Sequence, residues 1–222
     1  MSPSPAPVAA PVQANDAPAQ AKAPASKRQR TKQANRQAIL DAAREVFAEL
    51  GYGATSVRDI IRGTDLAAGT FYNYFPDKES VFRALIDESA LRARAVVRDA
   101  RARATTLEEF VSGGFRAYFQ SIVEDVALFN LMRRNAGTIR TLTEDPALGA
   151  GVIDLAEDLE AAIRRGDLPP FDVEFMAGAM AGVGFEVGMR MVDRDPPDVD
   201  AAAAFATDVF LGGIERLARR RG

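Results

Sequence analysis

A dense group of aromatic and hydrogen-bonding side chains lies between Gly69 and Lys78, in the stretch GTFYNYFPDK. Four of the five residues from Phe71 to Phe75 are aromatic, although aromatic residues make up only 8% of the chain. A tyrosine joins a flat apolar ring to a hydroxyl donor, and a lysine ammonium is a compact positive charge. This combination is suited to contacts with an anionic groove rather than to bond-breaking chemistry.

The composition excludes several kinds of catalytic and metal site. The chain has 222 residues and a net charge of −3, and it contains neither Cys nor His. Thiolate catalysis, the commonest general base and the commonest transition-metal ligand are therefore absent. An all-helical enzyme would need a carboxylate or lysine centre, and among the late helices only Glu186 looks placed to face inward. We expect no metal and no cofactor.

Helical periodicity accounts for everything after residue 30, and no period-2 alternation is long enough for a strand. Gly51 is a natural stop for the first helix, and Asp77 is a natural N-cap for the fourth. Later helices are expected over about Val126–Arg134, up to Arg165, from Asp172 and up to Arg221. The sequence predicts an all-α protein of about nine helices.

Residues 57–75 have the size and spacing of a helix-turn-helix, whose second helix enters the DNA major groove. Phe71 and Phe75 are four residues apart, so they share a face and are expected to bury against the first two helices. The remaining residues of this segment are expected to face DNA. Gly69 would allow close backbone approach, Thr70 and Asn73 would reach base edges, Tyr72 and Tyr74 would lie at the groove edge, and Lys78 would hold a phosphate.

The run from Arg36 to Leu85 resembles the TetR-type transcriptional regulators. The resemblance rests on ILDAAREVFAELGYGATSVRDII and on the pattern Gly-Thr-x-Tyr-x-x-Phe-x-x-Lys in LAAGTFYNYFPDKESVF. It implies an all-helical homodimer. The N-terminal domain would bind double-stranded operator DNA, and the C-terminal domain would bind an effector and dimerise through its last two long helices.

The resemblance also implies roles for individual residues. It places Thr55, Ser56, Tyr72, Tyr74 and Lys78 on phosphates, and Ala68, Gly69, Thr70 and Asn73 near base edges. Two residues depart from the family pattern. Ala67 replaces a Ser or Thr that often caps the recognition helix, and Tyr74 replaces a frequent His, which removes any pH dependence from that position.

Three segments are expected along the chain: a disordered Ala/Pro-rich tail with a basic end over 1–30, a helix-turn-helix domain over 31–78, and an effector-binding and dimerisation domain over 79–222. The basic run KRQRTKQANR, residues 27–36, is either a solvated tail or an arm that contacts DNA. The apolar stretch 175–192 is interrupted by Glu186 and Arg190, so no membrane span is expected and the location is expected to be cytoplasmic.

The C-terminal part supplies many apolar side chains to few helices, which favours a cavity for an apolar or amphipathic effector. The expected lining comprises Phe110, Tyr118, Phe119, Phe129, Met132, Arg133, Phe175, Met176 and Met180. Small residues spaced for close helix approach favour a dimer face, expected to comprise Gly178, Gly182, Phe205, Val209, Phe210, Ile214 and Leu217. For any single apolar residue, a plain core role is the simpler interpretation.

These features favour a ligand-responsive regulator, most simply a repressor that an effector releases from a palindromic operator. An activator would use the same parts. The alternatives outside this class are an all-helical enzyme and a helical protein-interaction module in which the basic run is incidental. Salt dependence separates the last alternative, because DNA binding weakens steeply with salt and an apolar protein contact does not.

Overall fold

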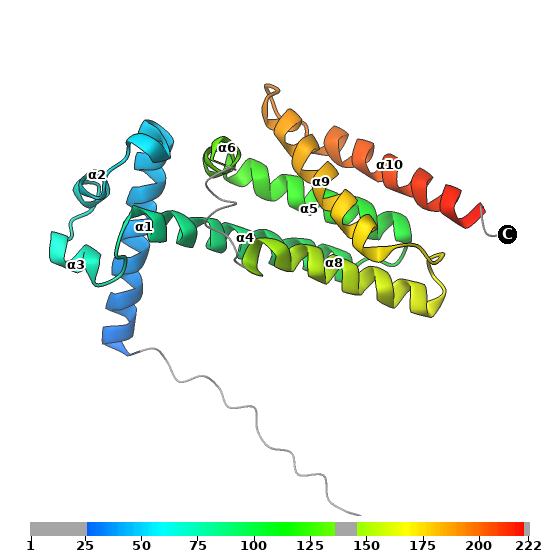
Figure 1. Cartoon of the computed structure of the whole chain (residues 1–222), viewed down its shortest axis with the longest axis horizontal. Coiled ribbons are helices and arrows are strands. Elements are labelled where there is room, and N and C mark those ends of the chain that lie inside the picture. The colour runs from blue at the N-terminus through cyan, green and yellow to red at the C-terminus, as the bar shows by residue number, and fades with distance from the viewer. Residues whose placement is uncertain (1–25, 136–145, 220–222) are drawn as a thin grey trace, which may run out of the picture.

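The computed structural model describes residues 26–135 and 146–219, except for the side chains of 146–148. These ranges contain nine helices and no strand, which confirms the all-α prediction. The helices are α1 (Lys27–Ala54), α2 (Val57–Arg62), α3 (Ala68–Tyr72), α4 (Lys78–Ala102), α5 (Leu107–Glu124), α6 (Val126–Arg134), α8 (Pro146–Arg165), α9 (Val173–Val192) and α10 (Val199–Arg219). Figure 1 shows α1–α3 at one end of the molecule and α10 toward the other.

The N-terminal core is a closed cluster of apolar side chains from α1, α2, α3 and the first half of α4. Its largest members are fully buried: Phe47, Phe71 and Phe82 expose at most 1% of their surface. The Phe47 and Phe82 rings meet edge to face with centroids 5.7 Å apart, a favoured geometry for aromatic pairs. Gly51, with φ of 77°, interrupts α1 where the sequence predicted a stop.

Two helices link this core to the rest of the chain. Val81–Ile86 of α4 and the α6 residues Leu128 and Leu131 belong to the N-terminal core, so it does not end at residue 78. The division into domains 31–78 and 79–222 stays a prediction. The expected disorder of 27–30 is wrong, because α1 begins at Lys27; the tail 1–25 lies outside the described residues.

The C-terminal core forms around α5, which packs against α4, α9 and α10. Residues four apart on α5 share a face, and Phe115 stacks on Phe119 and on Phe210 of α10 with centroids 5.9 and 5.7 Å apart. Asp172 caps α9, as expected, by accepting a hydrogen bond from the backbone N–H of Phe175 at 2.9 Å. The result is a helical unit whose buried members come from α5, α6, α8, α9 and α10.

Helix α9 is the one described helix that is long and apolar enough to span a membrane, judged by length and composition alone. One face of this helix, including Ala177, Met180 and Met191, is buried in the C-terminal core. Core helices meet the same criterion, so it is weak evidence for a span. Its apolar composition arises because the outward face, with Phe175, Gly178 and Gly182, is apolar as well.

Candidate functional site

The outer face of α2 and α3 combines exposed polar groups with a rigid attachment to the N-terminal core. Phe71 is 1% exposed and Phe75 is 5% exposed, as predicted, whereas Tyr72 between them is 58% exposed. Helix α3 has only five residues, too few for a helix that is stable alone. The two phenylalanines therefore fix α3 on the core and leave Tyr72 directed outward.

The other predicted DNA-facing residues of α3 are mostly accessible. Ala68, Gly69 and Asn73 are exposed, and Thr70 and Tyr74 are half-buried. Ala67 is the N-cap of α3 and makes no side-chain cap hydrogen bond, as its side chain predicts. A Cβ at Gly69 would meet no described atom within 4 Å. Packing within the chain therefore does not explain this glycine, and the backbone here is open to a large partner.

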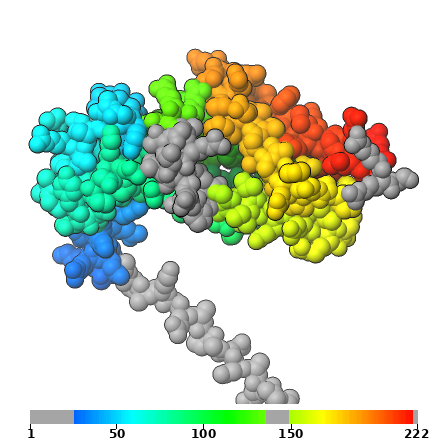
Figure 2. Space-filling view, viewed as in Figure 1, coloured from blue at the N-terminus to red at the C-terminus, as the bar shows by residue number. Residues whose placement is uncertain are grey.

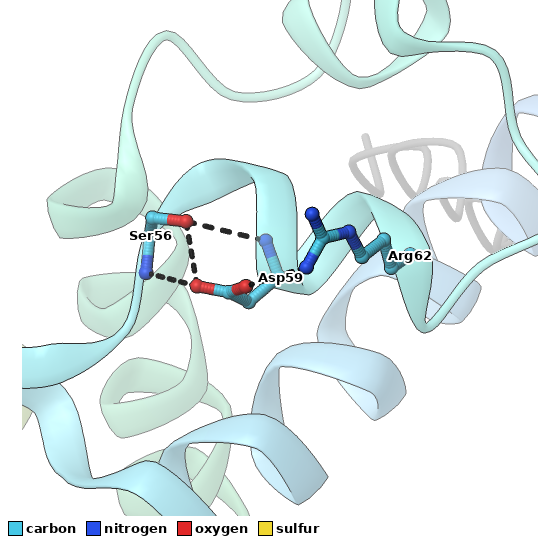
Figure 3. A network of polar contacts seen from close by, with 3 residues as sticks. All are labelled: Ser56, Asp59 and Arg62. Carbon is cyan, nitrogen blue, oxygen red and sulfur yellow. Dashed lines mark hydrogen bonds and ion pairs between the residues drawn. The ribbon is translucent and has the colours of Figure 1, made fainter.

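Ser56 opens α2 through a reciprocal cap that Figure 3 shows in detail. Its hydroxyl donates to the Asp59 carboxylate at 2.6 Å and accepts from the Asp59 backbone N–H at 3.4 Å. The Ser56 backbone N–H also donates to this carboxylate at 2.9 Å, and the two hydrogen bonds that the carboxylate accepts from Ser56 hold the pKa of Asp59 below its usual value. Ser56 is exposed, so it can still face a phosphate. Its hydroxyl is oriented by the cap.

Thr55 and Lys78 have structural roles that the sequence did not predict. The Thr55 side chain is 2% exposed and donates to the Gly51 carbonyl at 2.8 Å, so its predicted side-chain contact with a phosphate is wrong. The Lys78 ammonium donates to the carbonyls of Tyr52, Gly53 and Thr55 at 2.9, 3.2 and 2.8 Å. Its three donors are used, so the side chain ties α4 to the α1–α2 turn, and its contact with a phosphate stays a prediction.

A cavity of about 420 Å³ lies in the C-terminal unit. That volume is within the range of small-molecule sites, roughly 300–1,000 Å³. The lining comes from five helices: Ser89, Ala90, Ala93, Arg94, Val97 and Arg101 of α4; Phe110, Val111, Gly114, Phe115, Tyr118, Ser121 and Ile122 of α5, with Asp125; Phe129 and Met132 of α6; Gly151, Val152 and Leu155 of α8; and Met180, Ala181, Gly184 and Phe185 of α9. Figure 2 shows the outer surfaces of α8 and α9, two of the helices that line the cavity.

The structure divides the predicted lining residues into two groups. Those at the cavity wall are Phe110, Tyr118, Phe129, Met132 and Met180. The other four do not line it. Phe119 is fully buried in the core, Met176 packs on the C-terminal core outside the cavity wall, Arg133 pairs with Asp193 at 2.9 Å, and Phe175 is 79% exposed. The placement of Phe175 and Arg133 in a pocket is wrong, because each lies on a different surface.

Charged residues of α4 were missed by the sequence, although they close one wall of the cavity. Arg94 holds the Asp154 carboxylate of α8 through two hydrogen bonds of 2.6 and 2.7 Å, and this keeps the pKa of Asp154 below its usual value. Seven residues later on α4, Arg101 contacts Asp158 at 2.9 Å and is itself buried. The sequence did contain a signal for this contact between α4 and α8. The two arginines are seven residues apart on α4, and the two acids are four residues apart on α8.

The remaining polar groups at the wall are few. Tyr118 is half-buried at the surface of the cavity, and burial raises the pKa of its phenol to about 12. The hydroxyl is therefore neutral at physiological pH and available as a donor. The other polar side chains at the wall are those of Ser89, Ser121 and Asp125. A mostly apolar wall with these few polar groups favours a ligand with a long apolar part and a small polar part.

Helix α6 connects the cavity to the N-terminal core. Phe129 and Met132 line the cavity, whereas Leu128 and Leu131, on the other side of the same helix, are buried in the N-terminal core. Asp125 lies at the junction. Its carboxylate accepts from the Leu128 backbone N–H at 3.1 Å, lines the cavity and forms an ion pair with Arg44 of α1.

The outward face of α9 and α10 carries some of the predicted dimer residues. Phe205 is 60% exposed and Val209 is 47% exposed, and a Cβ at Gly178 or Gly182 would meet no described atom within 4 Å. Leu217 is half-buried. Phe210 and Ile214 are buried in the chain's own core at 7% and 3% exposure, so their assignment to an outer face is wrong.

The fold and these surfaces define a class: a helix-turn-helix unit joined to a helical unit with a cavity. A family model described as bacterial regulatory proteins, tetR family, matches residues 39–85. The repressor AcnR of Corynebacterium glutamicum is 31% identical over 130 residues, 59% of this chain and 62% of AcnR. A regulator of Haemophilus influenzae is 29% identical over 48% of this chain and 53% of its own length. The chain thus spans about half to three fifths of these curated relatives.

Solved structures extend the likeness over most of the chain. FadR, a fatty acid degradation regulator from Bacillus halodurans, has a TM-score of 0.70 and 26% identity over 81% of this chain and 96% of its own. FadR from Bacillus subtilis, solved with stearoyl-CoA, has a TM-score of 0.71 and 23% identity over 80% of this chain and 98% of its own. At this identity the likeness shows the fold alone. Residues 39–85 are thus similar to the tetR-family regulators, and the fold of most of the chain is similar to that of FadR from Bacillus halodurans.

Proposed function

We propose that the protein is a transcription regulator that binds operator DNA through the outer face of α2 and α3. The observation that carries this proposal is the alternation along α3, where Phe71 is 1% exposed and the adjacent Tyr72 is 58% exposed. Gly69, Asn73 and Ser56 lie on the same accessible segment. The match of residues 39–85 to the tetR family model and the similarity to the repressor AcnR support the assignment. Such a regulator would act in the cytoplasm.

A homodimer would present two copies of this surface to DNA. The exposed apolar face of α9 and α10, with Phe175, Gly178, Gly182, Phe205 and Val209, supports association of two chains there. Glycines in helix interiors destabilise the helix by about 1 kcal/mol relative to alanine, so an uncrowded glycine needs an external reason. Two recognition helices would then enter major grooves roughly 34 Å apart on a palindromic operator.

The cavity is proposed to bind an apolar or amphipathic effector that releases the protein from DNA. Its wall is mainly apolar, and Tyr118, Arg94 and Arg101 are among its few polar groups. The relative FadR of Bacillus halodurans regulates fatty acid degradation by its description, which makes fatty acids and their CoA thioesters the first compounds to test. If an effector strengthened DNA binding instead, the protein would be an activator or a repressor that needs its ligand as a co-repressor.

Two helices are proposed to carry the response. The first half of α4 belongs to the N-terminal core and its second half lines the cavity, and α6 contacts both regions. A ligand that displaced Phe129 or Asp125 would move Leu128, Leu131 and Arg44 with them. A coupling free energy of about 1–3 kcal/mol is enough for a useful switch.

The proposal is tested by fluorescence anisotropy of duplexes from the DNA upstream of the coding sequence, or of duplexes selected by the protein from a random pool. Wild type is expected to bind a specific duplex tightly and to lose at least 100-fold in affinity with Tyr72→Ala. Ile153→Ala, at an exposed position on α8, is the matched control. Binding that neither depends on sequence nor weakens with Tyr72→Ala would contradict the proposal and favour a protein-interaction module.

A further inference from the structure

The first eight residues of α1, Lys27 to Ala34, project beyond the N-terminal core. Every residue from Ser26 to Ala34 is exposed, and the first buried side chain is that of Ile39. A reciprocal cap fixes the helix start: the Ser26 N–H donates to the Gln29 side chain at 2.8 Å, and the Ser26 hydroxyl accepts from the Gln29 N–H at 3.3 Å. The segment is therefore a defined helical extension that buries nothing in the chain itself.

The extension continues the face of α1 that packs on the recognition unit. Arg28, Lys32, Arg36 and Leu40 are each four residues apart, so each is a neighbour of the next in a stripe that winds slowly around the helix. Leu40 is buried in the N-terminal core. Arg36 pairs with Glu88 at 2.5 Å, and its guanidinium lies 5.6 Å from the centroid of the Phe75 ring, just beyond α3.

Lys32 and Arg28 precede Arg36 in the chain and lie about 6 and 12 Å from it along the helix axis, because the rise is 1.5 Å per residue. In Figure 1 this end of α1 extends past α3, on the side away from α6. Both cations thus belong to the part of α1 that extends past α3. Twelve ångströms correspond to roughly three or four base pairs of duplex DNA.

The charge of the extension is of one sign. Residues 27–36 contain five Lys and Arg residues and no acid. Lys27, Arg28 and Lys32 are exposed and form no ion pair with another described residue. Aligned exposed cations on a rigid helix complement a regular polyanion. A membrane surface is a poorer match, because an interfacial helix needs a face of large apolar residues and this segment has none.

We propose that this basic extension, Lys27–Asn35, is a second DNA-contacting element that holds phosphates flanking the site read by α3. It adds affinity without base selectivity, since ammonium and guanidinium groups on phosphates carry no sequence information directly. The inference rests on the proposed DNA binding, and its effect is separate from that of α3. Arg28 and Lys32 are its central residues.

The test is the salt dependence of DNA binding by full-length wild type and the Arg28→Gln/Lys32→Gln double variant. Each lost phosphate contact lowers the slope of log affinity against log salt by about 0.9, so the double variant is expected to lose about 1.8. Between 50 and 200 mM salt it should then lose roughly twelvefold less affinity than wild type. Glutamine keeps helix propensity, and circular dichroism checks that α1 is retained.

The matched control is Arg98→Gln/Arg103→Gln, which makes the same charge change at two exposed positions on the C-terminal side. It is expected to leave the slope unchanged. The ratio of affinities for the selected and a scrambled duplex should also stay the same in the Arg28→Gln/Lys32→Gln variant. An unchanged slope, or a slope that changes equally in the control, overturns this inference and leaves the function of α3 intact.

Two further outcomes are informative. A loss of the selected-to-scrambled ratio would mean that the extension reads bases, which contradicts a phosphate-holding role. If wild type bound neither duplex at low salt, the proposed function itself would fail and this inference with it.

Discussion

The two hydrophobic cores of the chain differ in what they leave open. In the N-terminal core, Phe47, Phe71 and Phe82 are buried in one cluster with at most 1% exposure, whereas Tyr72 of α3 is 58% exposed. In the C-terminal unit, Phe110 and Phe129 border an internal space of about 420 Å³. The first arrangement presents a rigid outer surface, and the second presents an interior. A large rigid partner needs a rigid outer surface to bind to, whereas a small flexible one needs an interior space that can enclose it.

The largest effect is expected where the closed core is opened. Phe71→Ala should destabilise the fold by about 3–5 kcal/mol, because a buried aromatic is removed and a cavity remains. Tyr72→Ala, one residue later and 58% exposed, should change the free energy of unfolding by less than about 0.5 kcal/mol. Urea denaturation measures both. Similar losses for the two variants would mean that α3 has no distinct outer face.

A second contrast separates crowded from open glycines on α9. A Cβ at Gly188 would lie 2.7 Å from Ile122 Cδ1, whereas one at Gly182 would meet no described atom within 4 Å. Gly188→Leu should therefore destabilise the chain by about 1–3 kcal/mol through overpacking, independently of protein concentration.

Gly182→Leu should instead weaken the proposed dimer, with a dissociation constant raised at least tenfold in sedimentation equilibrium. Any change in its unfolding should depend on protein concentration, because dimers gain stability by mass action. A concentration-independent loss for Gly182→Leu would show that this face meets the chain's own core and not a partner.

The sequence separated the two faces of α3 but not those of α9 and α10. Phe71 of α3 and Phe75 just after it are four apart and the side chains between them differ in polarity, so the pattern identifies the buried face. On α10, Phe205 and Val209 form one apolar stripe and Phe210 and Ile214 form the next. Both stripes are apolar, one covered by the chain and one exposed, and periodicity cannot assign them.

Polar contacts between residues far apart in the chain could not be predicted from the sequence either. The acceptors of Lys78 are backbone carbonyls 23–26 residues earlier, and every residue carries such an acceptor. Asp125 and Arg44 are far apart in the chain, and only the packing of α6 on α1 brings them together. The family pattern fixed the fold of the N-terminal unit and gave no information on these pairs.

The cavity can be tested by filling it. Ala93→Phe adds a ring to the α4 wall, and Ala95→Phe adds the same ring at an exposed position of that helix. The first should reduce binding of acyl-chain ligands at least tenfold, or about 1.4 kcal/mol, and should leave operator affinity in the absence of ligand unchanged. Isothermal titration with a chain-length series of fatty acids and acyl-CoA thioesters measures this. Equal effects of both variants would remove the cavity from the account.

The smallest effect is expected at the link between the two regions. Asp125→Asn keeps an N-cap for α6 but removes the ion pair with Arg44. For a half-buried pair we expect a shift of about 1 kcal/mol or less, seen as a two- to fivefold change in the ligand concentration that releases DNA. Ligand affinity of the free protein should change less. An identical dose response would assign the coupling to α4 alone.

The most direct measurement for the central claim is a hydroxyl-radical footprint of the full-length protein on its selected operator. If two copies of the α2–α3 face read successive major grooves, protection should appear in two segments whose centres lie about one helical turn, roughly 34 Å, apart. Both segments should disappear with Tyr72→Ala and persist with Ile153→Ala. A single uniform protected stretch, or two segments that Tyr72→Ala leaves unchanged, would contradict the assignment of DNA recognition to this face.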